Sequence, residues 1–120
     1  MLASAVFLTV LSAAEQFCVR RVTAEVLTQT QVLLSCIREE RFEDALKLSL
    51  DMDQAWDRNA KLLETMVDHG STDEVRYAFS RLIAALEEQD SATAMVYAGE
   101  LEGSIEHVFE RQAVTLENIL

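Results

Sequence analysis

The sequence predicts an all-α fold, an antiparallel bundle of about four helices. Apolar residues recur every three or four positions through most of the chain, which is the period of a helix with one buried face. The 120 residues include no proline and only three glycines, too few for the turns of an all-β chain. Half of the residues are hydrophobic, so the chain can bury a core. A length of 120 residues leaves no room for a second core.

The chain opens with an apolar segment over residues 2–14, followed by Glu15. A membrane-spanning helix needs about 20 apolar residues, so the segment has three interpretations. It is a short membrane anchor that continues to residue 19, with Arg20 and Arg21 at the interface. Alternatively, it is a cleaved signal peptide, although no basic residue precedes it, or a helix that packs against the protein or a partner. We favour the anchor, with an anchor segment over residues 1–19 and a helical bundle domain over residues 20–120.

The first helix is expected to be long and continuous with this anchor. Its apolar positions follow a helical period, although the alternation of threonine and glutamine over residues 28–31 is also typical of a strand. A second helix begins near Phe42 and carries a broad apolar face to Val67. The separation between the two helices is weak, because residues 39–41 contain neither glycine nor proline.

The last two helices have clearer boundaries. Gly70 suits the left-handed position that follows a helix, and Ser71 with Glu74 forms a capping box that opens the third helix. Asp90 or Ser91 is the expected cap of the fourth helix. Short connections favour antiparallel neighbours, and the sequence shows no repeat with a fixed period. The expected aromatic anchors of the core are Trp56, Phe79 and Phe109.

The chain is strongly acidic. Ten lysines and arginines face 21 aspartates and glutamates, which leaves a formal net charge of −11. This balance argues against a basic surface for nucleic acid. Glu102, Glu106 and Glu110 recur every four residues and form an acidic stripe on the fourth helix. An exposed, solubilising face is the simpler interpretation of this stripe, and a surface for a basic partner or a cation is the alternative.

The sequence carries little that points to chemistry, since no spacing matches the common zinc, di-iron or calcium motifs. We therefore predict no catalytic residue, no enzymatic activity and no cofactor. Cys18 and Cys36 are expected about 27 Å apart on one helix, too far apart to bridge, so they are free thiols or links between chains. Local packing is the simpler role for His69 and His107, but a bundle that brings the two together would form a pH-responsive contact or a weak metal site.

Several short motifs occur in an order that adds to these inferences. They are Arg41-Phe42-Glu43-Asp44-Ala45, Trp56, Val67-Asp68-His69, Arg81-Leu82, Glu106-His107-Val108 and the ending Thr115-Leu116-Glu117-Asn118-Ile119-Leu120. Through them the span from Phe42 to Leu120 resembles domain-of-unknown-function family 4363, small bacterial proteins with an N-terminal membrane anchor and a helical body. The resemblance implies a single-pass protein of the cell membrane whose body is extracytoplasmic, and it implies no assigned activity. Arg20 and Arg21 would by themselves place the body towards the cytoplasm.

These observations together favour a non-enzymatic, membrane-tethered helical domain that acts by binding another protein or as a structural module. The expected partner is a membrane or extracytoplasmic protein, and a homo-oligomer is compatible with the sequence. The alternative is a metal- or pH-sensing domain that uses His69 and His107. The candidate partner-binding positions are the acidic stripe, Glu102, Glu106 and Glu110, and an apolar tail, Leu116, Ile119 and Leu120.

Overall fold

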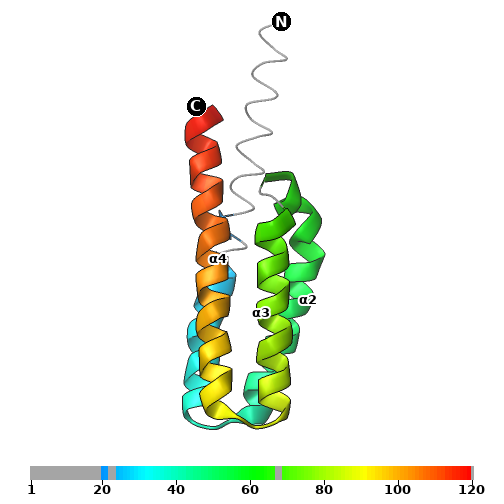
Figure 1. Ribbon diagram of the computed structural model, residues 1–120, viewed down its shortest axis with the longest axis vertical. Helices are drawn as coiled ribbons and strands as arrows, with labels where there is room; N and C mark the ends of the chain where they lie inside the picture. Colours follow the sequence, from blue (N-terminus) through cyan, green and yellow to red (C-terminus); the bar gives the residue numbers. More distant parts are fainter. Residues whose placement is uncertain (1–19, 22–23, 67–68, 120) are drawn as a thin grey trace, which may run out of the picture.

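The computed structural model describes the backbone of residues 20–21, 24–66 and 69–119, and the side chains of residues 20–21, 24–59, 70, 72–108 and 110. Four helices account for nearly all of this described part: residues 24–38, α2 (Phe42–Met66), α3 (His69–Glu87) and α4 (Ser91–Ile119). They confirm the predicted all-α bundle (Figure 1). Residues 28–31 are helical, so the strand alternative is wrong. The expected anchor over residues 1–19 lies outside the described residues.

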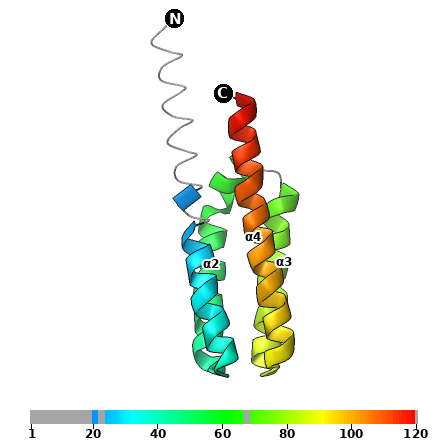
Figure 2. The ribbon, with the colours of Figure 1, turned by 90° about the vertical axis from the view of Figure 1, so that its left-hand side faces the viewer.

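The four helices alternate in direction around one core. Figures 1 and 2 show the helix 24–38 beside both α2 and α4, and α3 beside both α2 and α4. A hydrogen bond from Gln31 Nε2 to Glu102 Oε2, 2.9 Å long, joins the helix 24–38 to α4. Because α4 has 29 residues and α3 has 19, the last turns of α4 extend beyond the start of α3 (Figure 1).

Two turns of the same construction connect the helices at one end of the bundle. Glu40 and Gln89 each adopt a left-handed backbone conformation, with φ of 56° and 55°. The amide of each residue donates to the carbonyl three residues earlier, at 3.0 Å in both turns. The following amide donates to the carbonyl five residues earlier, at 2.9 and 3.0 Å. This pattern is the Schellman motif, built here without glycine at the left-handed position.

The two turns belong to an internal repeat. Glu40 and Gln89 are 49 positions apart (89 less 40), and the same offset matches buried positions of the first two helices with buried positions of α3 and α4. The bundle therefore consists of two helical hairpins with one pattern of burial. No repeat was evident in the sequence, because the matched positions often hold different residue types. The pairs in which both side chains are buried are Val26/Val75, Thr30/Phe79, Leu33/Leu82, Cys36/Ala85, Ile37/Leu86, Ala45/Ala94, Ser49/Ala98, Met52/Leu101 and Trp56/Ile105.

The core lies between the hairpins. Trp56 and Phe79 are among its largest fully buried side chains, and the side chain of Phe109 lies outside the described residues. The buried hydroxyl of Thr30 is satisfied, because it donates to the carbonyl four residues earlier at 2.7 Å. Ser49 Oγ and Trp56 Nε1 are buried without a hydrogen-bond partner among the described residues. Each such group lowers the stability of the fold.

Of the two helix caps predicted in the second hairpin, one is wrong and one is confirmed. α3 begins at His69, so Gly70 and Ser71 lie inside its first turns, and the predicted cap at Ser71 is wrong. The predicted cap of α4 is confirmed at Asp90. Its Oδ1 accepts a hydrogen bond from the amide of Thr93 at 3.1 Å, and its Oδ2 accepts one from the hydroxyl of Thr93 at 2.6 Å. Asp90 thereby satisfies one of the amides that a helix start leaves unpaired.

Candidate interaction groove between α3 and α4

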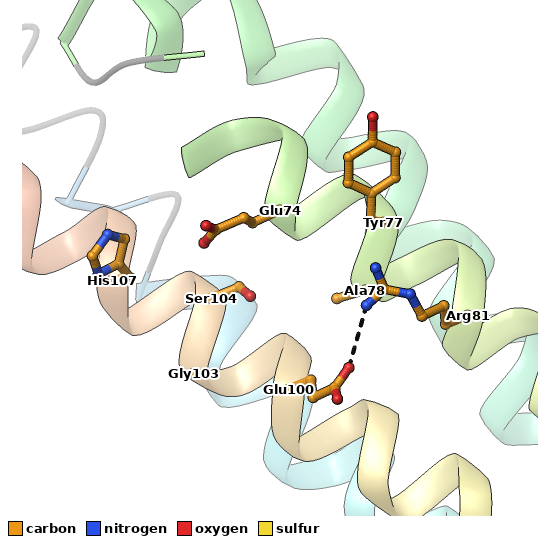
Figure 3. A pocket seen from close by; sticks show the side chains of 8 residues that line it. All are labelled: Glu74, Tyr77, Ala78, Arg81, Glu100, Gly103, Ser104 and His107. Atoms are coloured by element: carbon orange, nitrogen blue, oxygen red, sulfur yellow. Dashed lines mark hydrogen bonds and ion pairs between the residues drawn. The ribbon is translucent and has the colours of Figure 1, made fainter. Parts of the chain in front are cut away.

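The outer seam between α3 and α4 contains an open groove of about 460 Å³. Both helices contribute residues at the spacing i, i+3, i+4 and i+7, which lie on one face of a helix. Figure 3 shows Glu74, Ala78 and Arg81 of α3 on the side towards α4, while the ring of Tyr77 points away from α4. The residues that line this groove are Glu74, Tyr77, Ala78 and Arg81 from α3, and Glu100, Gly103, Ser104 and His107 from α4.

Two small residues form the floor of the groove. Ala78 is buried against the core, and the half-buried Ser104 lies opposite it on α4. Gly103 lies midway between the buried residues Leu101 and Ile105, so it is exposed on the outer face of α4, at the rim of the groove. A Cβ atom added to Gly103 would meet no atom within 4 Å, as at Gly99, so it would point into open space. Tyr77 stands at the α3 rim with 60% of its surface exposed. The groove therefore combines a low floor with an exposed aromatic rim.

An ion pair crosses the groove near its middle. Arg81 Nη1 on α3 lies 3.4 Å from Glu100 Oε2 on α4 (Figure 3). Beyond Arg81 a second hollow of about 280 Å³ continues along the same seam towards the turn at residues 88–90. Its lining includes Arg81 itself and Tyr97 of α4. The two hollows lie along one seam, and the ion pair separates them. We refer to the two hollows together as the α3–α4 groove.

Carboxylates dominate the charge of the α3–α4 groove. Glu74, Glu88, Asp90 and Glu100 line it, against the single guanidinium of Arg81. Hydrogen bonds from the hydroxyl and the amide of Thr93 lower the pKa of Asp90, so this carboxylate stays ionised at neutral pH. Glu74 makes no hydrogen bond or ion pair with another described residue, and its side chain points across the groove towards α4 (Figure 3). The groove therefore presents net negative charge to solvent.

The repeat supplies an internal comparison for these residues. The offset of 49 places Gly103 at the position of Gln54, and Gly99 at the position of Leu50. It places Tyr77 at the position of Thr28. Nine matched positions are buried in both hairpins, so packing at these positions does not explain why the exposed positions differ. The match is incomplete at the groove, where Ala78 is buried and its counterpart Gln29 is half-buried. A glycine inside a helix costs about 1 kcal/mol relative to alanine, which is a further reason to seek a role for Gly103 outside the fold.

The acidic stripe is not one free surface. Glu102 accepts the hydrogen bond from Gln31 and faces the helix 24–38, while Glu106 and Glu110 are exposed on α4. Of the expected apolar tail, Leu116 and Ile119 lie on the last turns of α4, and Leu120 and all three side chains lie outside the described residues. The acidic stripe, Leu116 and Ile119 therefore share one long helix.

The two histidines are described unequally. His107 lies on α4 and lines the α3–α4 groove, whereas the side chain of His69, at the start of α3, lies outside the described residues. Within the described residues, no group of three or more histidine, cysteine, aspartate or glutamate side chains is arranged to hold a metal ion. Cys36 is a buried free thiol, and Cys18 falls in residues 1–19.

The groove residues Tyr77, Arg81, Glu100 and Gly103 were not among the sequence-predicted contact positions. Their signal in the sequence is weak, because each is an ordinary helix-surface residue until its neighbours on the other helix are known. Gly99 and Gly103 are the exception, since two glycines in an otherwise uninterrupted helical pattern are unusual. That pair was the one clue to an open surface on α4.

Comparison with known proteins places this bundle in a family. Residues 14–119 match the family described as "Domain of unknown function (DUF4363)". The chain belongs to the DUF4363 family. The match covers most of the chain, and it includes both hairpins and the α3–α4 groove. No curated protein and no solved structure matches the chain.

The membrane anchor that the resemblance implies for this DUF4363 domain falls within residues 1–19. Across residues 20–21, 24–66 and 69–119, no helix has both the length and the apolar character needed to cross a membrane.

Proposed function

We propose that this DUF4363 domain is a non-enzymatic module that binds another protein through the α3–α4 groove. We further propose that residues 1–19 tether it to a cell membrane, with its body outside the cytoplasm. The apolar composition of residues 2–14 and the resemblance to membrane-anchored proteins support the tether. The partner is then a membrane or extracytoplasmic protein.

A single contrast carries the proposal of binding. The two hairpins share one pattern of burial, yet their outer seams differ at exposed positions. The second hairpin has Tyr77 and Gly103 where the first has Thr28 and Gln54. Exposed tyrosine is enriched in protein interfaces, because it offers a large contact area with few rotatable bonds. An exposed glycine allows a partner's backbone to approach closely.

Site-specific photo-crosslinking in the full chain tests this proposal. A benzoylphenylalanine in place of Tyr77 is expected to form an adduct with another protein when the chain is irradiated in its native cells. The matched control places the same residue at Thr28, the equivalent position of the first hairpin, which is also exposed. An adduct from position 77 that is weak or missing from position 28 supports the proposal. No adduct from either position, or equal adducts from both, contradicts it.

The tether is tested separately. The full chain with a C-terminal tag is produced in its native cells, and protease is added to intact spheroplasts. We expect the membrane fraction to contain the chain and the added protease to remove the tag. A tag that is protected until the membrane is lysed would contradict the extracytoplasmic placement, and a chain found only in the aqueous fraction would contradict the tether.

A further inference from the structure

We infer that the α3–α4 groove accepts a cationic amphipathic helix of the partner. The inference rests on the proposed function and names the chemistry of what binds. Three features of the groove lead to it: its direction along two packed helices, its floor of small residues, and the sign of its charge.

The shape of the groove favours a helix. The lining residues of α3 and α4 extend for two turns in the first hollow and continue through the second. A third helix that lies along such a seam places its own side chains at i, i+3, i+4 and i+7 between the two existing rows, as in helix-in-groove recognition. Ala78 and Ser104 on the floor, and Gly103 at the α4 rim, leave room for this helix.

The charge of the groove favours lysine or arginine on that helix. Four carboxylates and one guanidinium line the two hollows. Glu74 has no ionic partner among the described residues, and Glu100 is held only by the half-exposed Arg81. A cationic side chain between them would pair with Glu74 and share Glu100. Complementary charge of this kind sets the specificity and the association rate of a complex.

The same charge argues against a second copy of this chain as the occupant. The chain has a net charge of −11, so two copies repel each other. On α4, Glu106 and Glu110 are both exposed. A second α4 laid into the groove would bring these carboxylates towards Glu74 and Glu100, and like charges at an interface weaken binding. The occupant is therefore a different protein segment of opposite charge.

The test uses the full chain and two synthetic probes. One probe is a peptide of leucine, alanine and lysine in a heptad pattern, about 21 residues long so that it can form a stable helix. The other has every lysine replaced by glutamate. We expect the lysine peptide to bind the wild-type chain with one-to-one stoichiometry, and the glutamate peptide not to bind.

Two matched pairs of variants locate the binding. Gly103→Leu adds bulk at the α4 rim of the groove, while Gly99→Leu adds the same bulk at an exposed glycine that does not line the groove. Glu74→Gln removes one charge from the groove, while Glu25→Gln removes one at the equivalent position of the first hairpin. We expect Gly103→Leu and Glu74→Gln to raise the Kd for the lysine peptide about tenfold or more, and both controls to change it less than about twofold.

Each other outcome overturns the inference. If neither peptide binds, or both bind equally, the charge assignment is wrong. If Glu25→Gln weakens binding as much as Glu74→Gln, the peptide responds to net charge and not to the groove. If Gly103→Leu leaves the Kd unchanged, the groove is not where a helix lies. In any of these cases, an adduct from position 77 would still support protein binding, so the inference and the proposed function fail separately.

Discussion

Arg81 on α3 and Glu100 on α4 form an ion pair across the α3–α4 groove, with Nη1 and Oε2 3.4 Å apart. Both side chains are about half exposed, at 52% and 47%. An exposed pair of this kind contributes about 0–1 kcal/mol to stability. The pair is therefore weak enough for the proposed cation of a partner to compete with Arg81 for Glu100.

Removal of the Arg81 side chain should change the stability of the fold only slightly but should strengthen peptide binding. We expect Arg81→Ala to lower the free energy of unfolding by no more than about 1 kcal/mol, and to tighten binding of the lysine peptide because Glu100 loses its internal partner. Thermal unfolding and titration calorimetry measure the two effects. Arg76→Ala is the control, because Arg76 pairs with Asp57 at 3.3 Å and does not line the groove. Equal tightening in both variants would show that only net charge had changed.

Ser49 is expected to be a point of instability in the core. Its Oγ is buried and finds no hydrogen-bond partner in the described part of the chain, and the equivalent position of the second hairpin holds Ala98. Ser49→Ala should therefore raise the free energy of unfolding by about 1 kcal/mol, because it removes a buried unsatisfied hydroxyl. The reverse change, Ala98→Ser, should lower it by a similar amount. Chemical denaturation measures both, and a loss of stability in Ser49→Ala would contradict the assignment.

The two left-handed turn residues offer a test of the repeat. Glu40 and Gln89 carry side chains at φ of 56° and 55°, a conformation that glycine adopts without strain. We expect Glu40→Gly and Gln89→Gly to raise the free energy of unfolding by similar amounts, about 0.5 kcal/mol each. Glu88→Gly, at the preceding position, should lower it. Opposite signs at positions 40 and 89 would show that the turns are not equivalent.

Acid should weaken the cap of α4. The hydrogen bonds from Thr93 lower the pKa of Asp90 below its usual value of 3.8. A carboxylate with a lowered folded-state pKa adds stability above its unfolded-state pKa, and this stability disappears as the pH falls through the folded-state value. Asp90→Ala should therefore lower the melting temperature at pH 7, and the difference from wild type should shrink below about pH 4. A difference that does not change with pH would contradict this role.

Asp53 should show the opposite sign. Burial raises the pKa of Asp53 above 3.8, the charge of Asp57 raises it further, and Arg76 offsets part of this rise. The ionised form is thus less favourable in the folded chain, so this group stabilises the fold increasingly as the pH falls through its folded-state pKa. Asp53→Asn should raise the melting temperature at pH 7. The gain should decline as the pH is lowered towards 4, and a loss of stability at pH 7 would contradict it.

The helical period predicted most of the fold, because each helix buries one face and the spacing of apolar residues in the sequence indicates which face it is. The cap at Asp90 was also predictable from residue type. The turn at residues 39–41 was difficult to predict from the sequence, because Glu40 takes a left-handed conformation that is usually adopted by glycine. The repeat was hidden because it preserves burial rather than identity, as Thr30 and Phe79 illustrate.

The candidate site was harder to predict for a geometric reason. Residues four apart on a helix rotate by about 40° relative to each other, so a stripe with that spacing drifts around the helix. Glu102 therefore faces the helix 24–38 and binds Gln31, while Glu110 is exposed. A groove depends on which faces two helices turn towards each other, and one helix alone does not contain that information.

The central claim is that another protein binds in the α3–α4 groove, and crosslinking in glycine variants tests it most directly. Benzoylphenylalanine replaces Tyr77 in three full-length chains: wild type, Gly103→Leu and Gly99→Leu. We predict an adduct in the wild type and in Gly99→Leu, and its loss in Gly103→Leu although that chain remains folded by circular dichroism. An adduct of equal yield in folded Gly103→Leu would contradict the claim, because the partner would then contact Tyr77 without entering the groove.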